Sequence, residues 1–119
     1  MPRILVVDDS STVRRYYRKL LEQAGCYVEE AISGGEALEK VYSGKYDLLL
    51  VDVNMPKMDG YSFLRELRQS EDLDPMPVLM ITTEGGVADM DRGFQAGCNM
   101  YLVKPVDPDE LLAYVELLG

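Results

Sequence analysis

Four apolar segments of the chain are each followed by side chains that can take part in chemistry. The segments are residues 4–7, 48–51, 78–81 and 101–103. The side chains that follow them are Asp8 with Asp9, then Asp52, Thr82 and Lys104. Strands buried in a parallel sheet read as continuous apolar runs, and ligand sites lie beyond their carboxyl ends. The sequence therefore predicts that three carboxylates, a hydroxyl and an ammonium group gather at one edge of a sheet.

Three carboxylates held close together require either protonation or a cation. Two of them about 5 Å apart repel by roughly 3 kcal/mol at an effective dielectric constant near 20. Magnesium prefers oxygen ligands, is usually held by one or two carboxylates, and keeps water or phosphate oxygens in its other positions. With such a cation bound, one carboxylate can attack a phosphoryl group while Lys104 and Thr82 neutralise charge on the transferred oxygens. These residue types therefore indicate phosphoryl transfer to an aspartate.

Apolar runs alternate with amphipathic segments along the whole chain, which is typical of an α/β fold with helices on both faces of a parallel sheet. We expect strands near residues 3–7, 27–31, 47–51, 78–82 and 99–103. Helices are expected between the strands and after the last one, giving a doubly wound five-stranded sheet with five helices. The fourth helix contains Gly93 in its interior, at a cost of about 1 kcal/mol relative to alanine. It is predicted to be the weakest helix.

The length and composition of the chain limit the functions open to it. Its 119 residues suit one domain spanning residues 1–119. The formal charge of −9, from 21 acids and 12 bases, repels nucleic acid and anionic membranes, so we expect neither as a partner. No apolar run approaches the roughly 20 residues that cross a bilayer, and no signal-peptide pattern is present, which predicts a cytoplasmic protein.

The histidine and cysteine content of the chain narrows the chemistry open to it further. The chain contains no histidine, which rules out Ser-His-Asp and Cys-His catalysis and the usual zinc sites. Cys26 and Cys98 form no CxxC motif and are expected to be unpaired thiols.

Four motifs, taken in order, give the chain a family resemblance. They are Ile4-Leu5-Val6-Val7-Asp8-Asp9, the segment DVNMPKMDG at residues 52–60, Ile81-Thr82-Thr83-Glu84, and Lys104-Pro105. Together they resemble the receiver domain of two-component response regulators over the whole chain. Within that family the chain is similar to the single-domain chemotaxis regulator CheY, notably in residues 11–15, residues 77–80 and Tyr101. The resemblance implies a flavodoxin-like sheet with strand order 2-1-3-4-5.

The resemblance also implies a phosphoacceptor and a metal site. Asp52 would accept the phosphoryl group from a phosphohistidine on a partner protein. Mg²⁺ or Mn²⁺ would be bound by Asp9, by Asp52 and by the backbone carbonyl of Asn54, with Asp8 acting through a water molecule. Asn54 and Glu84 would tune the loss of the phosphoryl group.

The remaining implied roles concern charge and switching. Lys104 would pair with the phosphoryl oxygens, and the peptide bond before Pro105 would be cis. Thr82 would move toward the phosphoryl group, and Tyr101 would move from an exposed to a buried position. This rearrangement would change a surface formed by the fourth helix, the fifth strand and the fifth helix.

The implied partners are proteins. A sensor histidine kinase or a phosphotransfer protein would deliver the phosphoryl group. The switched surface would bind a downstream target, with a flagellar motor switch protein as the candidate for a stand-alone chemotaxis-type regulator. The chain would be a monomer or a phosphorylation-dependent dimer, and would catalyse only its own phosphorylation and dephosphorylation. A basic stripe suits either a solvated helix face or a docking surface for an acidic partner; it comprises Arg14, Arg15, Arg18 and Lys19.

Other interpretations remain open from sequence alone. The chain could be a receiver excised from a longer transcriptional regulator, which would dimerise through the fourth and fifth helices. It could be an Asp-nucleophile phosphohydrolase, although that class has DxDxT where this chain has residues 8–12, DDSST. It could be a binding domain that keeps the fold without phosphorylation. Taken singly, Asp9 could cap the first helix, Thr82 could be an ordinary strand-end hydroxyl, and Tyr101 could be a packed aromatic residue.

Overall fold

The computed structural model describes residues 1–119, in which five parallel strands form one sheet in the order β2-β1-β3-β4-β5. The strands are β1 Arg3–Val7, β2 Tyr27–Ala31, β3 Leu48–Asp52, β4 Val78–Thr82 and β5 Met100–Val103. The helices are α1 Ser11–Gln23, α2 Gly34–Ser43, α3 Gly60–Gln69, α4 Val87–Ala96 and α5 Pro108–Leu118. The predicted doubly wound fold and its strand order are confirmed.

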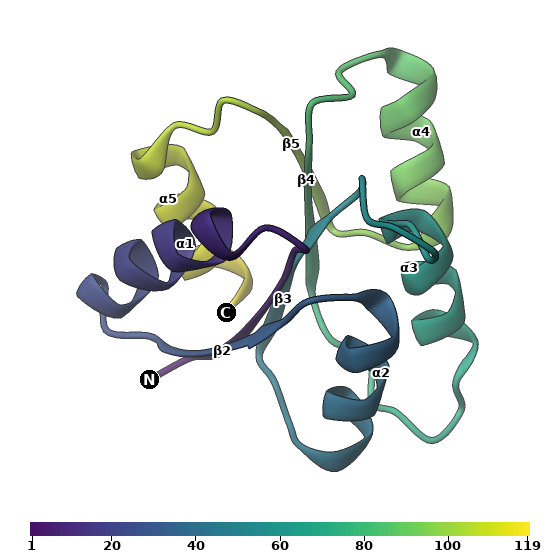
Figure 1. Ribbon diagram of the computed structural model, residues 1–119, viewed down its shortest axis with the longest axis horizontal. Coiled ribbons are helices and arrows are strands. Elements are labelled where there is room, and N and C mark those ends of the chain that lie inside the picture. The colour runs from purple at the N-terminus through teal and green to yellow at the C-terminus, as the bar shows by residue number, and fades with distance from the viewer.

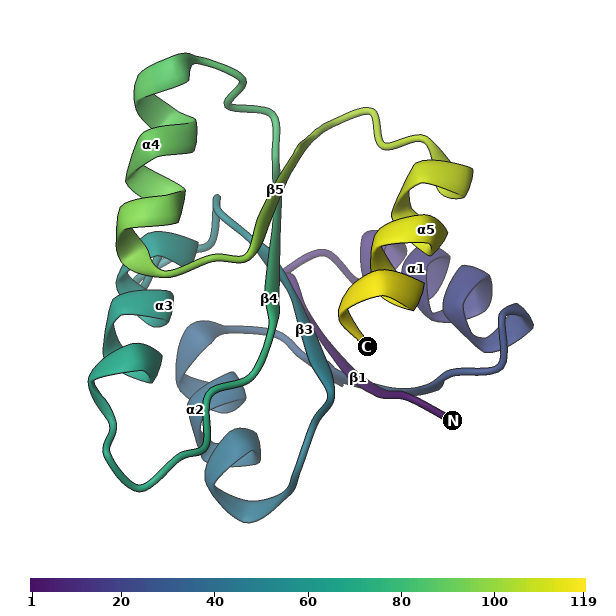
Figure 2. The ribbon, with the colours of Figure 1, turned by 180° about the vertical axis from the view of Figure 1, so that it is seen from behind.

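The sheet separates the core into two layers, because successive strand residues point to opposite faces. Leu5 and Leu49 belong to the layer that packs against α2, α3 and α4. Their neighbours Ile4 and Leu50 belong to the layer that packs against α1 and α5. Figures 1 and 2 show these two groups of helices on opposite sides of the sheet. The central strands β3 and β4 are buried at every position, which explains their unbroken apolar sequences.

Two strands differ by one residue from their predicted ranges of 47–51 and 99–103. β3 extends to Asp52, which pairs with Ile81 of β4, so the acid belongs to the strand itself. At the other edge, Asn99 lies outside β5, where its side-chain oxygen accepts the backbone N–H of Val78 at 2.9 Å. The backbone N–H of Asn99 also donates to the carbonyl of Val78 at 2.8 Å, so the backbone and the side chain of Asn99 both bond the first residue of β4.

Gly93 in α4 has a packing role that helix propensity alone does not reveal. A Cβ atom at this position would lie 2.8 Å from Cδ2 of Tyr101, so the tyrosine ring of β5 packs directly against the helix backbone. The helix begins after Gly86, which offers no side-chain cap, and ends at Gly97 in the left-handed region. Each helix of the protein is too short or too polar to span a membrane.

Candidate functional site

The carboxyl ends of β1 and β3 bring three carboxylates together. Asp8, Asp9 and Asp52 each offer an oxygen atom, and these oxygens all lie within 4.8 Å of one another. Asp8 and Asp52 are buried, with 3% and 7% of their surface exposed, whereas Asp9 is exposed. Two acids of the cluster are therefore largely removed from water and one remains open to it.

Burial and mutual repulsion make the inner acids harder to ionise. Burial raises the pKa of Asp52 to about 6, the Asp8 carboxylate adds to the rise, and Lys104 opposes it. Burial also raises the pKa of Asp8, even though the backbone N–H of Ser10 donates to its Oδ1 at 2.9 Å. A cation among these oxygens would favour the ionised form of both acids.

Lys104 supplies the one ammonium group that faces the acids. Its Nζ lies 3.5 Å from Oδ1 of Asp52 and 4.0 Å from Oδ2 of Asp8. The peptide bond between Lys104 and Pro105 is cis, as the family resemblance implied. One positive charge compensates only part of the charge of three carboxylates, so a second cation would be favoured electrostatically.

The donor set of the cluster suits a hard divalent cation. All three side chains offer oxygen, and the cluster contains no thiolate or imidazole that would favour zinc or copper. Asp9 is exposed, which leaves the cluster open to water on one side. Oxygen ligands on one side and solvent on the other match the preference of Mg²⁺ for a few carboxylates completed by waters or phosphate oxygens.

Thr82 is fully buried at the end of β4, next to this cluster in the sheet. Its Oγ1 accepts the backbone N–H of Glu84 at 3.1 Å and the side-chain amide of Asn54 at 3.4 Å. Both contacts use lone pairs of the oxygen, so the hydroxyl proton is free to be donated elsewhere. The residues predicted to tune dephosphorylation, Asn54 and Glu84, thus both contact the predicted switch threonine.

Tyr101 occupies a buried position, with 5% of its surface exposed. Its hydroxyl donates to the backbone carbonyl of Glu84 at 2.7 Å and lies 3.0 Å from the hydroxyl of Tyr61. Tyr61 also lies 3.1 Å from the carbonyl of Asp89, and its ring is covered by the guanidinium of Arg92 at 4.4 Å. Sequence reasoning missed Tyr61. The signal that could have found it is a tyrosine on the buried face of α3, because a buried hydroxyl needs a partner.

Gly60 is a second residue that sequence reasoning did not assign to the site. A Cβ atom at Gly60 would lie 2.7 Å from the backbone carbonyl oxygen of Asp52. Its own N–H donates to the carbonyl of Val53 at 2.8 Å. The absence of a side chain therefore lets the first residue of α3 pack directly against the backbone at the end of β3.

The alternative role of Asp9 as a helix cap is wrong. Ser10 is the N-cap of α1, and its Oγ accepts the backbone N–H of Val13 at 3.3 Å. A serine cap satisfies this donor without using the aspartate. The carboxylate of Asp9 is therefore left to face the acid cluster.

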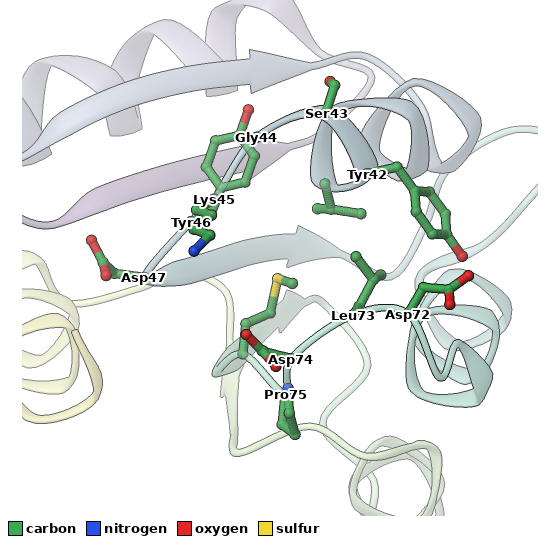
Figure 3. A pocket seen from close by; sticks show the side chains of 12 residues that line it. Tyr42, Ser43, Gly44, Lys45, Tyr46, Asp47, Asp72, Leu73, Asp74 and Pro75 are labelled. Atoms are coloured by element: carbon green, nitrogen blue, oxygen red, sulfur yellow. The ribbon is translucent and has the colours of Figure 1, made fainter.

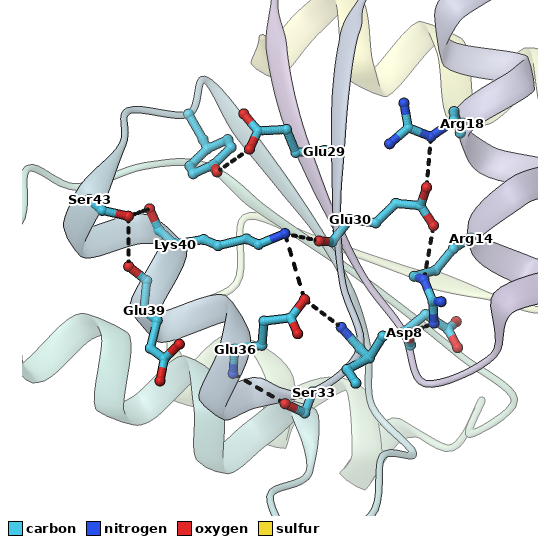
Figure 4. Close-up of polar contacts among 12 residues, drawn as sticks. Asp8, Arg14, Arg18, Glu29, Glu30, Ser33, Glu36, Glu39, Lys40 and Ser43 are labelled. Atoms are coloured by element: carbon cyan, nitrogen blue, oxygen red, sulfur yellow. Dashed lines mark hydrogen bonds and ion pairs between the residues drawn. The ribbon is translucent and has the colours of Figure 1, made fainter.

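The predicted basic stripe on α1 divides into two pairs. Arg14 and Arg18 point to Glu30 of β2, with N–O distances of 2.9 and 2.7 Å (Figure 4). Arg15 and Lys19 are exposed. Only the second pair is free to serve as a docking surface.

Two cavities lie at opposite ends of the strands. One, of about 440 Å³, lies at the amino ends of β3 and β4 between the α2–β3 connection and residues 72–76 (Figure 3). Its lining mixes side chains such as Tyr42, Asp47 and Leu73, far along the strands from the acids. A shallower groove of about 640 Å³ lies at the acid edge, between Tyr16 and Tyr17 of α1 and the segment 104–106. The groove, not the deeper pocket, adjoins the reactive groups.

Residues 4–116 match the family described as the response regulator receiver domain. The chain belongs to this family. The receiver domain is 40% identical over 118 residues to chemotaxis protein CheY1 of Helicobacter pylori, covering 98% of this chain and 95% of CheY1. The crystal structure of chemotaxis protein CheY4 of Vibrio cholerae superposes with a TM-score of 0.92 and 36% identity, covering 100% of this chain and 99% of CheY4. The protein is therefore a CheY-like receiver domain of a two-component system.

Longer regulators also match the receiver domain. It is 39% identical over 116 residues to the transcriptional regulatory protein ResD of Bacillus subtilis, covering 98% of this chain and 47% of ResD. The match to the regulator RpaA of Synechocystis covers 49% of that protein. The chain thus spans about half the length of these relatives and nearly the full length of CheY1.

Proposed function

We propose that this receiver domain is phosphorylated on Asp52 in a Mg²⁺-dependent reaction, and that the modification switches a protein-binding surface. The observation that carries the proposal is the convergence of Asp52 with Asp8, Asp9 and Lys104 at one edge of the sheet. A lone carboxylate is a weak nucleophile, but here cation-binding oxygens and an ammonium group lie within a few ångströms of it. Residues 1–119 act as a single receiver unit in this proposal.

The residues present would hold a divalent cation in the way the family implies. Asp9, Asp52 and the backbone carbonyl of Asn54 are the proposed direct ligands of Mg²⁺ or Mn²⁺, with Asp8 acting through a water molecule. When bound, the ion neutralises negative charge on the oxygens of the incoming phosphoryl group.

The reaction itself is carried by the carboxylate of Asp52. One of its oxygens attacks the phosphorus of a phosphohistidine on a sensor histidine kinase or phosphotransfer protein. The new bond joins this oxygen to phosphorus, the P–N bond breaks, and its electron pair stays on the imidazole, which takes up a proton. Lys104 pairs with one phosphoryl oxygen, and the free hydroxyl proton of Thr82 is donated to another. The chain thereby modifies itself and turns over no separate substrate.

The proposed output surface consists of α4, β5 and α5. β5 is one of the two edge strands of the sheet, and α4 and α5 lie on either side of it (Figure 2). Exposed apolar side chains occur on α4 and β5, with exposed fractions of 77% for Val87, 45% for Phe94 and 40% for Val103. Thr82 and Tyr101 connect the phosphorylation site to this surface. The hydroxyl of Tyr101, in β5, donates to the backbone carbonyl of Glu84, which lies between Thr82 and the start of α4. Isolated exposed apolar residues are common, but several on the predicted switch surface support a protein-binding role.

The proposed donor surface lies on α1. Arg15 and Lys19 are exposed there, and the groove beside Lys104 adjoins the same helix. A kinase or phosphotransfer protein with an acidic surface could therefore dock on α1 and present its phosphohistidine to Asp52. The cytoplasm is the proposed location of this exchange.

Two outputs are consistent with this mechanism. A stand-alone chemotaxis-type regulator would bind a target such as a flagellar motor switch protein, as the match to nearly the full length of CheY1 favours. A receiver within a longer transcriptional regulator would dimerise on phosphorylation, as the matches to ResD and RpaA favour. Sedimentation of the phosphorylated chain separates them, because the first output predicts a monomer and the second a dimer.

Stoichiometry tests the proposed function against the phosphohydrolase alternative. The chain is incubated with Mg²⁺ and an excess of a small acyl phosphate, and both the protein mass and the released phosphate are followed. We expect the protein to gain a single phosphoryl group, with phosphate release limited by decay of that adduct. Sustained phosphate release without a labelled protein, and unaffected by Asp52→Asn, would contradict the proposal.

A further inference from the structure

We propose that Arg14 is a positioning residue for the magnesium site, holding the backbone of Asp8 in place through a charged bridge to Glu30. This inference rests on the proposed function, since it assumes that the acid cluster binds Mg²⁺. It concerns the peptide that carries two of the acids, Asp8 and Asp9, and not their oxygens directly.

Arg14 joins the end of β1 to the end of β2. Its Nη1 donates to the backbone carbonyl of Asp8 at 2.7 Å, and its Nε donates to Oε1 of Glu30 at 2.9 Å (Figure 4). Only 13% of the Arg14 side chain is exposed. A guanidinium is a rigid planar fork, so fixing Nε on Glu30 also fixes the direction of Nη1 toward Asp8.

Glu30 is itself held from three directions. Its Oε2 accepts from Nε of Arg18 at 2.7 Å, and its backbone carbonyl accepts from Nζ of Lys40 in α2. Burial disfavours the charge of Glu30, but hydrogen bonds from Arg18 and Arg14 outweigh it and lower the pKa of its carboxyl group. The anchor of Arg14 is therefore ionised at neutral pH and fixed to both neighbouring helices.

The same contacts determine how the acid pair is presented. Asp8 is bonded at both its backbone and its side chain, since its carbonyl accepts from Arg14 and its Oδ1 accepts from the N–H of Ser10. Asp9 follows directly, so the orientation of its carboxylate depends on the same peptide. Partners that orient metal ligands typically change metal affinity by about 10- to 100-fold when they are removed.

The sign of the effect separates positioning from simple electrostatics. Arg14 is a cation near a cation site, so its charge alone opposes Mg²⁺ binding. If charge were its only influence, Arg14→Ala would strengthen Mg²⁺ binding. Positioning predicts the opposite result.

Arg18 provides a matched control on the same helix. It is one turn further along α1 and bonds the same carboxylate of Glu30, yet it forms no hydrogen bond or ion pair with Asp8. Arg14→Ala and Arg18→Ala therefore each remove one arginine bridge to Glu30, but only the first releases the carbonyl of Asp8.

The test measures Mg²⁺ dissociation constants of the full chain by calorimetry, with the urea stability of each variant measured separately in EDTA. We expect Arg14→Ala to weaken Mg²⁺ binding by about 10-fold and Arg18→Ala by less than about twofold. Arg14→Lys, which keeps the charge but not the fork, should be intermediate and also serves as the second variant if Arg14→Ala does not fold.

Three results would overturn the inference. Unchanged or tighter binding by Arg14→Ala, with normal binding by the wild type, would overturn the role of Arg14 while leaving the proposed function intact. Equal weakening by Arg14→Ala and Arg18→Ala would assign the effect to the general stability of α1. No Mg²⁺ binding by the wild type would overturn both this inference and the metal site on which it rests.

Discussion

The hydroxyl groups of Tyr61 and Tyr101 lie 3.0 Å apart inside the protein and join the start of α3 to β5. The proton of Tyr101 is committed to the carbonyl of Glu84, so Tyr61 has one proton for two acceptors, the oxygen of Tyr101 and the carbonyl of Asp89. Burial raises the pKa of Tyr101, and its bond to Tyr61 adds to the rise, so the hydroxyl of Tyr101 stays neutral. The proposed switch residue is thus bonded to α3 and to the segment before α4.

Tyr61→Phe should lower the free energy of unfolding by about 1 kcal/mol, because the ring remains but one hydroxyl is lost from a buried network. Combined with Tyr101→Phe in a double-mutant cycle, it should show a coupling energy of about 0.5 to 1.5 kcal/mol. Urea denaturation measures both quantities. Tyr16→Phe, at an exposed position on α1, serves as the control and should combine additively with Tyr101→Phe. Additivity of the Tyr61 and Tyr101 changes would contradict this account.

Gly93→Ala should destabilise the protein even though alanine favours a helix by about 1 kcal/mol. The added methyl group would meet the ring of Tyr101 at 2.8 Å, and overpacking of this kind costs about 1 to 3 kcal/mol. We expect a net loss of about 1 kcal/mol in urea denaturation. In a Tyr101→Ala background, where the ring is absent, the same change should stabilise instead. Stabilisation by Gly93→Ala in the wild-type background would show that Tyr101 does not restrict this helix.

Asp52→Asn should stabilise the metal-free protein at pH 8 by about 1 to 3 kcal/mol. The pKa of Asp52 is raised in the fold from 3.8 to about 6, so its favourable contribution is complete below 3.8 and is lost as the pH rises through 6. The difference between variant and wild type should therefore shrink as the pH falls from 7 to 4. Urea denaturation in EDTA across this range measures it.

Two controls accompany the pH series. Asp91→Asn removes the same charge from an exposed position on α4 and controls for the loss of a negative charge as such. Added Mg²⁺ should stabilise the wild type more than Asp52→Asn at pH 8, because the bound cation offsets the repulsion among the ionised carboxylates. If the difference in the free energy of unfolding between Asp52→Asn and the wild type stayed constant across the pH range, the fold would not disfavour the ionised form of Asp52.

Arg15→Ala with Lys19→Ala should slow phosphotransfer from the partner kinase by about tenfold, since the two exposed cations on α1 are proposed to attract an acidic surface. Phosphorylation by a small acyl phosphate should be unchanged, because that donor needs no docking surface. Lys45→Ala removes an exposed cation from the α2–β3 connection and is the matched control. An unchanged transfer rate for the double variant would favour a merely solvated helix face.

The placement of the acids was predictable because it depends on local pattern. A charged residue ending an apolar run, as at Asp8, Asp52 and Lys104, marks a strand end, and parallel topology then places those ends together. The Tyr61–Tyr101 contact was not predictable in this way, since it joins residues 40 positions apart with no shared periodicity. Tertiary packing decides such pairs.

For two sequence features the pattern was recognised, but the residue that each feature contacts in the fold was not. Gly93 was identified as costly to its helix, but the ring that requires a glycine there belongs to a later strand. The basic residues of α1 were identified as one stripe, but helical spacing does not show that Glu30 of β2 lies opposite Arg14 and Arg18. In both cases the missing information was the partner across the interface.

Site mapping of the phosphoryl group tests the central claim most directly. The wild-type chain is treated with a small acyl phosphate and Mg²⁺, the acyl phosphate adduct is reduced with borohydride, and the modified residue is located by peptide mass spectrometry. The account predicts modification of Asp52 alone, abolished by EDTA and by Asp52→Asn. Modification at another residue, or equal modification of Asp52 without a divalent cation, would contradict it.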